Sequence, residues 1–255
     1  TRSLIVTGVQ TCALPILLYL FWAFFFGLIV YLQKESHREG YPMIDDGARQ
    51  QKIMGWPVPE PKTYLLAHGG EATQPTHVIH DHEVNLAAVP AHPWKGAPLV
   101  PTGNPMLDGI GPGAYARRAD VPDLTWDGKV KIIPLRVATD YNVAHQDADP
   151  RGMTIVGADD ESGGVVTDLW VDTAEVMFRY LEVKTHSGRQ VMVPMPFCRI
   201  TRSGVKVQAV LGHQFEDVPA LKQADQITFL EEEKVAGYFG GGTLYAEPSR
   251  AEPLV

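Results

Sequence analysis

The sequence predicts a single N-terminal transmembrane α-helix followed by a mainly β domain on the cytoplasmic side. Three features predict this fold class: an uncharged stretch near the N-terminus, a proline-rich region after it, and short β-type runs in the second half. The chain has 255 residues, enough for one sizeable domain and an anchor. We divide it into a tail, a membrane helix, an extended region, a β domain and a C-terminal tail, at residues 1–11, 12–32, 33–118, 119–246 and 247–255.

The membrane helix is expected over residues 12–32, a stretch of 21 residues without a charged side chain. About 20 apolar residues cross a hydrocarbon core as a helix, and no second segment of the sequence qualifies. A secretory signal peptide is the alternative, but its apolar region usually has about 7 to 15 residues. Residues 28–33 also offer no small-x-small cleavage site. We therefore predict a retained anchor.

The flanks of this helix predict its orientation. Lys34, His37 and Arg38 follow it directly, whereas only Arg2 precedes it. Cytoplasmic flanks are enriched in lysine and arginine, so we expect the C-terminal portion in the cytoplasm. Residues 1–16 resemble translated sequencing-adaptor sequence more than a natural tail, and we base no function on them.

Residues 41–112 are expected to form an extended strap. Eleven prolines fall in this range, a density that excludes long helices and central strands. A disordered linker is the alternative reading, but Trp56, Tyr64, Trp94 and other apolar residues are more frequent than a solvated linker needs. We expect the strap to lie on the surface of another protein.

The second half of the chain contains short β-type runs separated by glycine or polar turns, at residues 131–137, 165–171, 190–193 and 205–210. Residues 191–193 and 205–209 alternate with period two, as expected for half-buried strands. A small antiparallel barrel or sandwich is the expected architecture.

A first short helix is expected to interrupt the β runs. Asp172 and Glu175 have the spacing of a capping box. They precede apolar residues at helical intervals, namely Val176, Met177, Tyr180 and Leu181.

A second helix is expected to begin near Thr228, where LEEEK is a good helix former, and to end at Gly237. The glycines at 240–242 lack a following Lys-Ser or Lys-Thr, so they are not a phosphate-binding loop. They indicate a tight turn or a close backbone contact.

Composition and motifs exclude several classes of function. A net charge of −8 argues against nucleic acid as the main partner. Cys12 and Cys198 lie in different predicted domains, so this is not a disulfide scaffold. The chain shows no Ser-His-Asp arrangement, nucleophile elbow or Walker motif, so we expect no enzyme. No metal site is expected either, because no regular element would fix the histidine-rich group His77, His80, Asp81, His82, Glu83 and His92.

Five segments resemble the H (heavy) subunit of the photosynthetic reaction centre of purple bacteria, and they follow one another in the same order and spacing. They are YLQKESHREGYP, PEPKTYLLAHG, PTGNPMLDGIGP, VVTDLWVDTAEVMFRYLEV and LEEEKVAGYFGGGTLYAEP, at residues 31–42, 59–69, 101–112, 165–183 and 230–248. The resemblance extends from the membrane exit almost to the C-terminus.

The resemblance implies a cytoplasmic domain of the PRC-barrel type and a strap that packs on the L and M subunits. It implies a structural subunit that ligates no pigment, shields the quinone sites and helps to deliver protons to the secondary quinone during light-driven cyclic electron transfer. Bacteriochlorophyll, bacteriopheophytin, quinone and non-haem iron are then expected in the partner subunits, and none bound directly here. The implied location is the intracytoplasmic photosynthetic membrane, with the N-terminus in the periplasm. A cytochrome subunit, an antenna ring and membrane lipids are further implied partners.

The same resemblance points to candidate residues for a proton path. Full reduction of a quinone consumes two protons, and a buried site needs titratable groups to supply them. By similarity, Asp172 and Glu175 fall on the family's internal acidic positions, Arg179 lies one helical turn beyond, and His68 lies near the subunit interface. Plain capping and an i,i+4 ion pair are the alternative reading of the first three.

One departure from the family concerns its surface histidines. Asp127 and Lys129 occupy those positions here, so Asp127 is the expected proton collector and inhibition by divalent metals should be weak. Two other functions stay open on the residues alone: a membrane-tethered PRC-barrel adaptor outside a reaction centre, and an anchored enzyme that uses the histidine-rich group.

Overall fold

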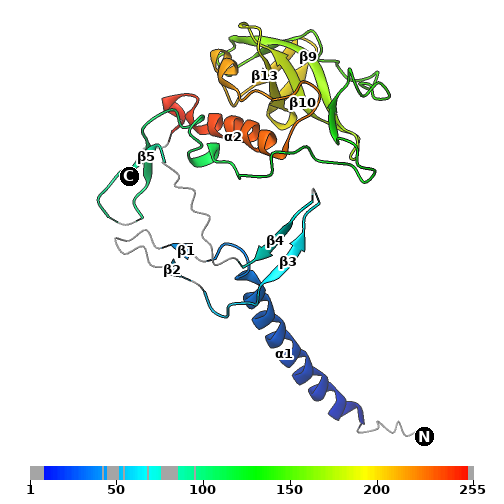
Figure 1. Cartoon of the computed structure of the whole chain (residues 1–255), viewed down its shortest axis with the longest axis vertical. Helices are drawn as coiled ribbons and strands as arrows, with labels where there is room; N and C mark the ends of the chain where they lie inside the picture. The colour runs from blue at the N-terminus through cyan, green and yellow to red at the C-terminus, as the bar shows by residue number, and fades with distance from the viewer. Residues whose placement is uncertain are drawn as a thin grey trace, which may run out of the picture. The chain divides into compact units, whose positions relative to one another are not determined.

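A computed structural model describes residues 9–41, 43–44, 52–53, 55–67, 69–75, 86–94 and 96–251. The chain divides into two compact units, Thr1–Val84 and Asn85–Val255, and each is described by itself. Figure 1 shows the elements of both units.

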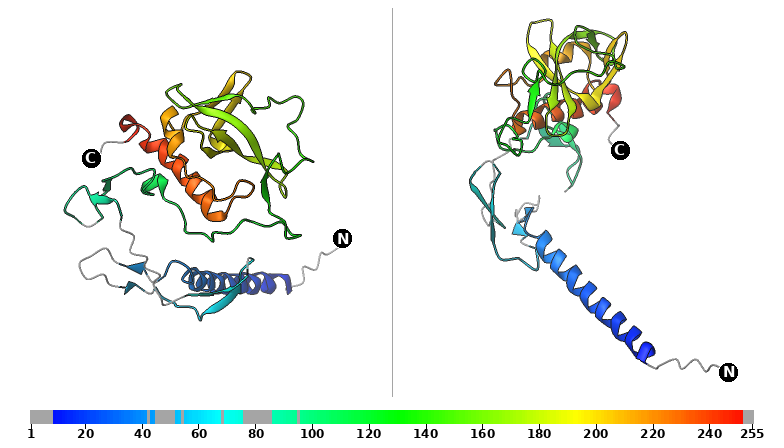
Figure 2. Two further views of the ribbon diagram at one scale, coloured as in Figure 1. Left: turned by 45° about the horizontal axis from the view of Figure 1, so that its top comes forward. Right: turned by 90° about the vertical axis from the view of Figure 1, so that its right-hand side faces the viewer.

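The first unit begins with helix α1, Val9–Ser36. Its apolar side chains are exposed from Ile16 onward, apart from the half-buried Leu28. The right-hand view of Figure 2 shows the helix as a straight rod. Within it, Pro15–Ser36 contains an 18-residue window with a mean hydropathy of 2.2 and has the length needed to cross a membrane. The expected apolar helix is confirmed, although it extends beyond both ends of 12–32.

The C-terminal end of α1 is tied to a small ribbon made of β3, Lys62–Leu65, and β4, Glu71–Gln74. Arg38 is buried and forms a two-pronged ion pair with Glu35, with nitrogen-to-oxygen distances of 2.7 and 3.0 Å. Its other terminal nitrogen donates to the carbonyls of Glu60 and Gln74. A second ribbon pairs β1, Met43–Ile44, with β2, Lys52–Ile53.

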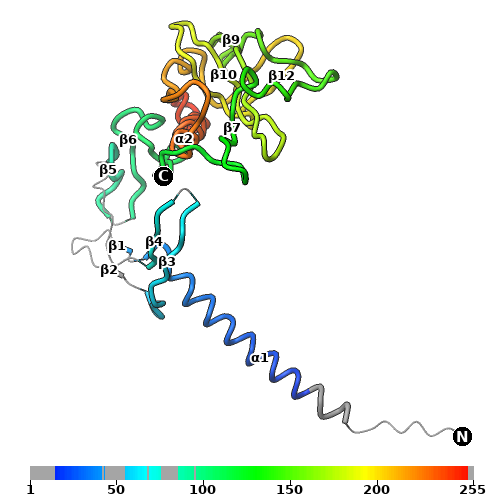
Figure 3. The backbone as a smooth tube through the Cα atoms, turned by 45° about the vertical axis from the view of Figure 1, so that its right-hand side comes forward, coloured from blue at the N-terminus to red at the C-terminus, as the bar shows by residue number. Residues whose placement is uncertain are grey.

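The second unit begins with a further ribbon, β5, Ala88–Pro90, paired with β6, Leu99–Pro101. Its main sheet contains β7, Ile132–Pro134; β8, Thr154–Val156; β9, Ser162–Asp172; β10, Met177–Lys184; β11, Gln190–Pro194; β12, Cys198–Thr201; and β13, Gly204–Val207. The order is β11-β10-β9-β8-β13-β12, with β7 also paired to β9. Figure 3 traces the backbone and labels β7, β9, β10 and β12 of this sheet. Only β8 and β13 pair in parallel. All four predicted β runs contain a strand, so the mainly β domain is confirmed.

The core of this unit lies between the curved sheet and a long helix. Its largest fully buried side chains are aromatic and come from β9, from the 3₁₀ helix Gly212–Asp217 and from the helix, namely Trp170, Phe215, Tyr238 and Phe239. Further short 3₁₀ helices span Gly111–Gly113, Met195–Phe197 and Pro248–Arg250.

The helix predicted to follow Asp172 is wrong, because these residues form the turn of the β9–β10 hairpin. Asp172 does accept hydrogen bonds from the N–H groups of Ala174 and Glu175, both at 3.0 Å, as a capping residue would. Val176, however, has a φ of 54°, so the chain turns back and Met177 pairs with Asp172. The four apolar residues at helical intervals do not share a face, since Val176 and Met177 are exposed whereas Tyr180 and Leu181 are buried. A β-bulge lies between Phe178 and Tyr180.

The second predicted helix is confirmed at its start and wrong at its end. Helix α2 spans Phe229–Tyr245, and Thr228 and Glu231 form a reciprocal capping box. The helix continues through Gly237 and the glycines at 240–242, because these positions lie against other backbone segments that leave no room for a side chain. A Cβ on Gly241 would lie 3.1 Å from the Cα of Gly113. The close contact predicted for 240–242 is therefore confirmed within a helix rather than a turn.

Candidate functional site

The β9–β10 turn brings Asp172, Glu175 and Arg179 together. Asp172 is 0% exposed, whereas the Glu175 side chain is 51% exposed. Arg179 is the residue that the bulge leaves unpaired, and its guanidinium binds both carboxylates. Its Nη2 lies 3.2 Å from Asp172 Oδ2 and 2.7 Å from Glu175 Oε2. The bulge thus orients the Arg179 side chain toward the two carboxylates of the turn.

A fourth and a fifth group come from the segment that leads into β7. Lys131 Nζ lies 3.6 Å from Asp172, 3.9 Å from Glu175 and 3.3 Å from Asp123. The backbone fixes this arrangement, since Lys131 donates its N–H to Asp123 and accepts one from Thr173, both at 2.9 Å. We call Asp123, Lys131, Asp172, Glu175 and Arg179 the turn cluster. Lys131 was not predicted, because its partners Asp172 and Glu175 are 41 and 44 residues away in sequence. Asp123 was not predicted either, because it joins the cluster only through Lys131.

Charge governs the turn cluster. Burial opposes the positive charge of Lys131, but the hydrogen bond to Asp123 and the charges of Asp172 and Glu175 outweigh it and raise the pKa of the lysine. The cluster holds three carboxyl groups and two cations. An uptake of one proton by a carboxyl group would therefore bring the charges of the cluster into balance.

A hydrogen-bonded pair of a carboxyl group and a tyrosine hydroxyl lies near the turn cluster. The Tyr180 hydroxyl donates to Glu232 Oε2 at 2.7 Å, which joins β10 to the first turn of α2. Burial is the main cause that raises the pKa of Glu232, and the charge of Asp123 adds to it. The pKa of Tyr180 is also raised, first by burial and then by Glu232. Sequence reasoning missed this pair, since nothing local marks two residues that meet only through tertiary packing.

The family of this chain follows from comparison with known proteins. A family model described as photosynthetic reaction centre, H-chain N-terminal region matches residues 7–137, about half of the chain. The chain belongs to the H-chain family of photosynthetic reaction centres. A PRC-barrel domain model matches residues 142–214 of this H chain. A match over the N-terminal half is not expected of an adaptor that shares only the barrel.

Asp127 of this H chain lies at the tip of the loop whose base supplies Asp123 and Lys131 to the turn cluster. Thr125 donates its hydroxyl to the carboxylate, and Lys129 Nζ lies 2.7 Å from it. These two contacts, the lysine first, lower the pKa of Asp127. The structure therefore does not join Asp127 to Asp172 or Glu175 through a direct contact. Its role as proton collector and the weak metal inhibition stay predictions.

The remaining histidine predictions fall mostly outside the described residues. His68 and the group from His77 to Glu83 are among the positions that the structure does not describe. His92 stacks on Trp94, with ring centroids 4.2 Å apart. Across the described ranges, no three His, Cys, Asp or Glu side chains of this H chain gather in a way that could hold a metal ion.

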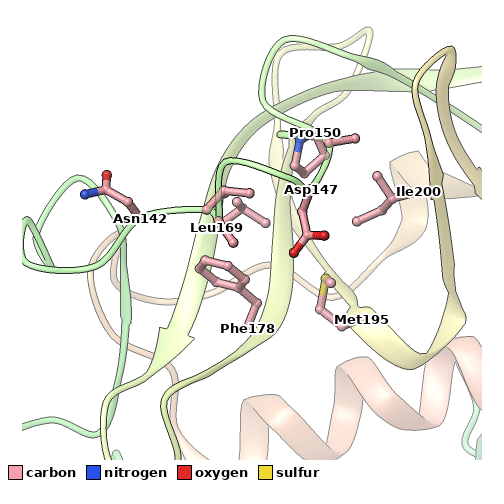
Figure 4. Close-up of a pocket in the computed structure, with 10 residues that line it drawn as sticks. Asn142, Asp147, Pro150, Leu169, Phe178, Met195 and Ile200 are labelled. Carbon is pink, nitrogen blue, oxygen red and sulfur yellow. The ribbon is translucent and has the colours of Figure 1, made fainter.

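A pocket of about 430 Å³ lies on the barrel behind the bulge (Figure 4). Its walls are mainly apolar, from residues such as Leu169, Phe178, Met195 and Ile200. Asp147 points its carboxylate into this space and is the one titratable group among the lining residues. The pocket therefore offers no acid–base pair, and the turn cluster remains the better candidate for proton chemistry.

Proposed function

We propose that this H chain is a structural, non-catalytic subunit that caps the cytoplasmic face of the L and M subunits, shields the quinone sites and helps to deliver protons to the secondary quinone. The observation that carries the proposal is the turn cluster, where a buried and a half-exposed carboxyl group share one guanidinium. Family membership supplies the context of a quinone that must take up two protons.

The two carboxyl groups of the turn have different roles in this proposal. Asp172 holds two backbone N–H groups and Arg179, so it positions the turn and the guanidinium. Glu175 Oε2 is bound to Arg179, whereas its Oε1 makes no hydrogen bond among the described residues and lies 3.9 Å from Lys131, so it is the oxygen that would take up a proton. Glu175 is half-exposed and is therefore the residue that exchanges protons with groups outside this chain.

Exposed apolar side chains around the turn cluster support docking on another protein. Val176 in the turn is 70% exposed, and Trp126 in the neighbouring loop is 98% exposed. Leu124 and Met177 are also exposed. Apolar residues gathered in this way mark an interaction surface more often than a solvated one. We propose that this face meets the L and M subunits, so that docking covers Glu175.

The strap and the anchor complete the proposal. In the first unit Trp56 and Leu65 are almost fully exposed, as expected for a strap that another protein covers. We propose that α1 crosses the photosynthetic membrane once, with the N-terminus in the periplasm. Bacteriochlorophyll, bacteriopheophytin, quinone and non-haem iron would belong to the partner subunits, and a cytochrome subunit or an antenna ring would be further neighbours.

Purification in mild detergent tests this function. The proposal predicts that the chain co-purifies with two larger membrane subunits in a complex that absorbs in the near infrared and contains quinone. A colourless, monomeric chain from photosynthetically grown cells would contradict it. A complex that forms normally but takes up protons at an unchanged rate after Glu175→Gln would retain the structural role and remove the proton role.

A further inference from the structure

A basic groove runs beside the edge strand β12, on the second unit and apart from the turn cluster. It has a volume of about 450 Å³ and lies between the β12–β13 hairpin and the C-terminal end of α2. Its lining residues include Phe197, Arg199, Lys206, Gln208, Thr243 and Arg250.

The charge of this groove is opposite to that of the whole chain. Arg199, Lys206 and Arg250 line it, and there is no carboxylate among the described residues that do so. The chain as a whole has a net charge of −8. Two of the three cations are paired with carboxylates outside the lining, Asp160 and Glu247, so a local excess of positive charge remains at the groove. This excess attracts anions to a protein whose net charge repels them.

Two of the cations face each other across the hairpin. Arg199 and Lys206 are direct partners in the antiparallel register of β12 and β13, so their side chains leave the same face of the ribbon. Like charges in this position destabilise a ribbon. Lys206 reaches away to Asp160, whose side chain is 75% exposed. The Arg199 side chain makes no ion pair or hydrogen bond within the described part of the chain.

The third cation is fixed in place before any ligand arrives. Arg250 pairs through Nε with Glu247 at 3.1 Å. Its Nη1 donates to three backbone carbonyls, of Gln208 at 2.9 Å and of Ala209 and Gly242 at 3.1 Å each. The Nη2 group has no acceptor among the described residues. A guanidinium held in this way loses little side-chain entropy on binding an anion.

We propose that this groove binds a phosphate-type oxyanion, either a phosphate monoester or a phosphodiester. Arg199, Lys206 and the Nη2 group of Arg250 would bind its oxygens, since guanidinium donors match the geometry of phosphate oxygens. The ring of Phe197 would form the wall for the group esterified to the phosphate. Two sources share this chemistry: the headgroup of an anionic phospholipid, and a small phosphorylated molecule in the cytoplasm.

The test uses the full-length chain in non-ionic detergent at constant ionic strength. Binding of inorganic phosphate, and of short-chain phosphatidylglycerol and phosphatidylcholine below their micelle concentrations, is measured by calorimetry. We expect saturable binding with one site per chain. Phosphatidylglycerol that binds at least tenfold more tightly than phosphate and phosphatidylcholine points to a lipid headgroup. Equal binding of phosphate and phosphatidylglycerol points to a small phosphorylated molecule.

Three variants locate the site. Arg199→Gln and Lys206→Gln should each weaken binding at least tenfold. Arg202→Gln, in the turn of the same hairpin but outside the groove, is the matched control and should change binding less than twofold. An equal loss in the control would show attraction to general surface charge only, and the absence of saturable binding to all three probes would overturn the proposal.

Thermal unfolding with and without the anion distinguishes lost binding from a folding defect in these variants. Removing one of two facing cations should leave the melting temperature of the ligand-free chain unchanged or raise it. The increase that the bound anion produces in the wild-type chain should be lost in Arg199→Gln. A variant that melts lower without any ligand would contradict the repulsion between Arg199 and Lys206.

Discussion

Replacing Asp172 with asparagine is expected to destabilise the second unit by about 2–3 kcal/mol. The carboxylate is fully buried and accepts two backbone N–H groups, and it binds Arg179 and Lys131. Asparagine can keep the two backbone bonds through its carbonyl oxygen, but its amide loses the charge and turns a donor toward the cations. Breaking a buried ion pair costs about 3–5 kcal/mol. Arg179 and Lys131 are partly exposed and can regain water, so the expected loss lies at or just below the lower end of that range.

Equilibrium urea unfolding of the full-length chain measures this loss, with tryptophan fluorescence as the signal, because Trp170 lies in the core of the same sheet. Asp127→Asn is the matched control, since this carboxylate is bound at a loop tip instead. It should leave the free energy of unfolding within experimental error. A loss below about 1 kcal/mol in Asp172→Asn, or an equal loss in the control, would refute the claim that Asp172 organises the turn.

Two further predictions concern α2. Burial raises the pKa of Glu232 above its ordinary value of 4.5, so its contribution to stability is present at low pH and is lost as the pH rises through the raised pKa. When the free energy of unfolding is measured from pH 4 to 8, Glu232→Gln should therefore become more stable relative to the wild type as the pH increases. A difference in free energy that does not change with pH would contradict the burial of Glu232. Gly242→Ala would place a Cβ 2.5 Å from the carbonyl oxygen of Ala209 and should cost about 1–3 kcal/mol by overpacking. Thermal unfolding measures this cost, and an unchanged melting temperature would show that α2 does not pack as closely as described.

Much of the fold could be predicted from local patterns. The uncharged stretch at 12–32 predicted α1, because length and apolarity alone decide whether a helix can cross a membrane. Period-two alternation indicated the strands β11 and β13, and β13 is more buried on one face as expected, with Val205 and Val207 inside. The half-buried pattern is wrong for β11, because Met192 is buried as fully as Val191 and Val193. The capping box of Thr228 and Glu231 is a local signal, and α2 begins where this signal lies.

Local patterns failed where backbone geometry or tertiary contact decides. Asp172 caps its turn as it would cap a helix, and only the positive φ of Val176 separates the two outcomes. Glycine commonly ends a helix. At Gly237 the helix continues, because the backbone carbonyl of Gly113 lies against this position and leaves no room for a side chain. These choices depend on the packed partner rather than on the segment itself.

The candidate site was predicted in part. Resemblance selected Asp172, Glu175 and Arg179, and the structure brings these three together. Lys131 and Glu232 escaped prediction, because a lysine before a strand and an acid in the first turn of a helix are ordinary features. Their importance comes from contacts that form only in the folded domain.

The rate of proton-coupled electron transfer to the secondary quinone in the purified complex tests the central claim most directly. In Glu175→Gln this rate should fall at least about tenfold, since a general acid–base group contributes factors of this size or more. Primary charge separation should be unchanged. Asp149→Asn is the control, because Asp149 pairs with Arg151 in an ion pair of similar exposure. Proton uptake and electron transfer at the wild-type rate in Glu175→Gln would contradict the account.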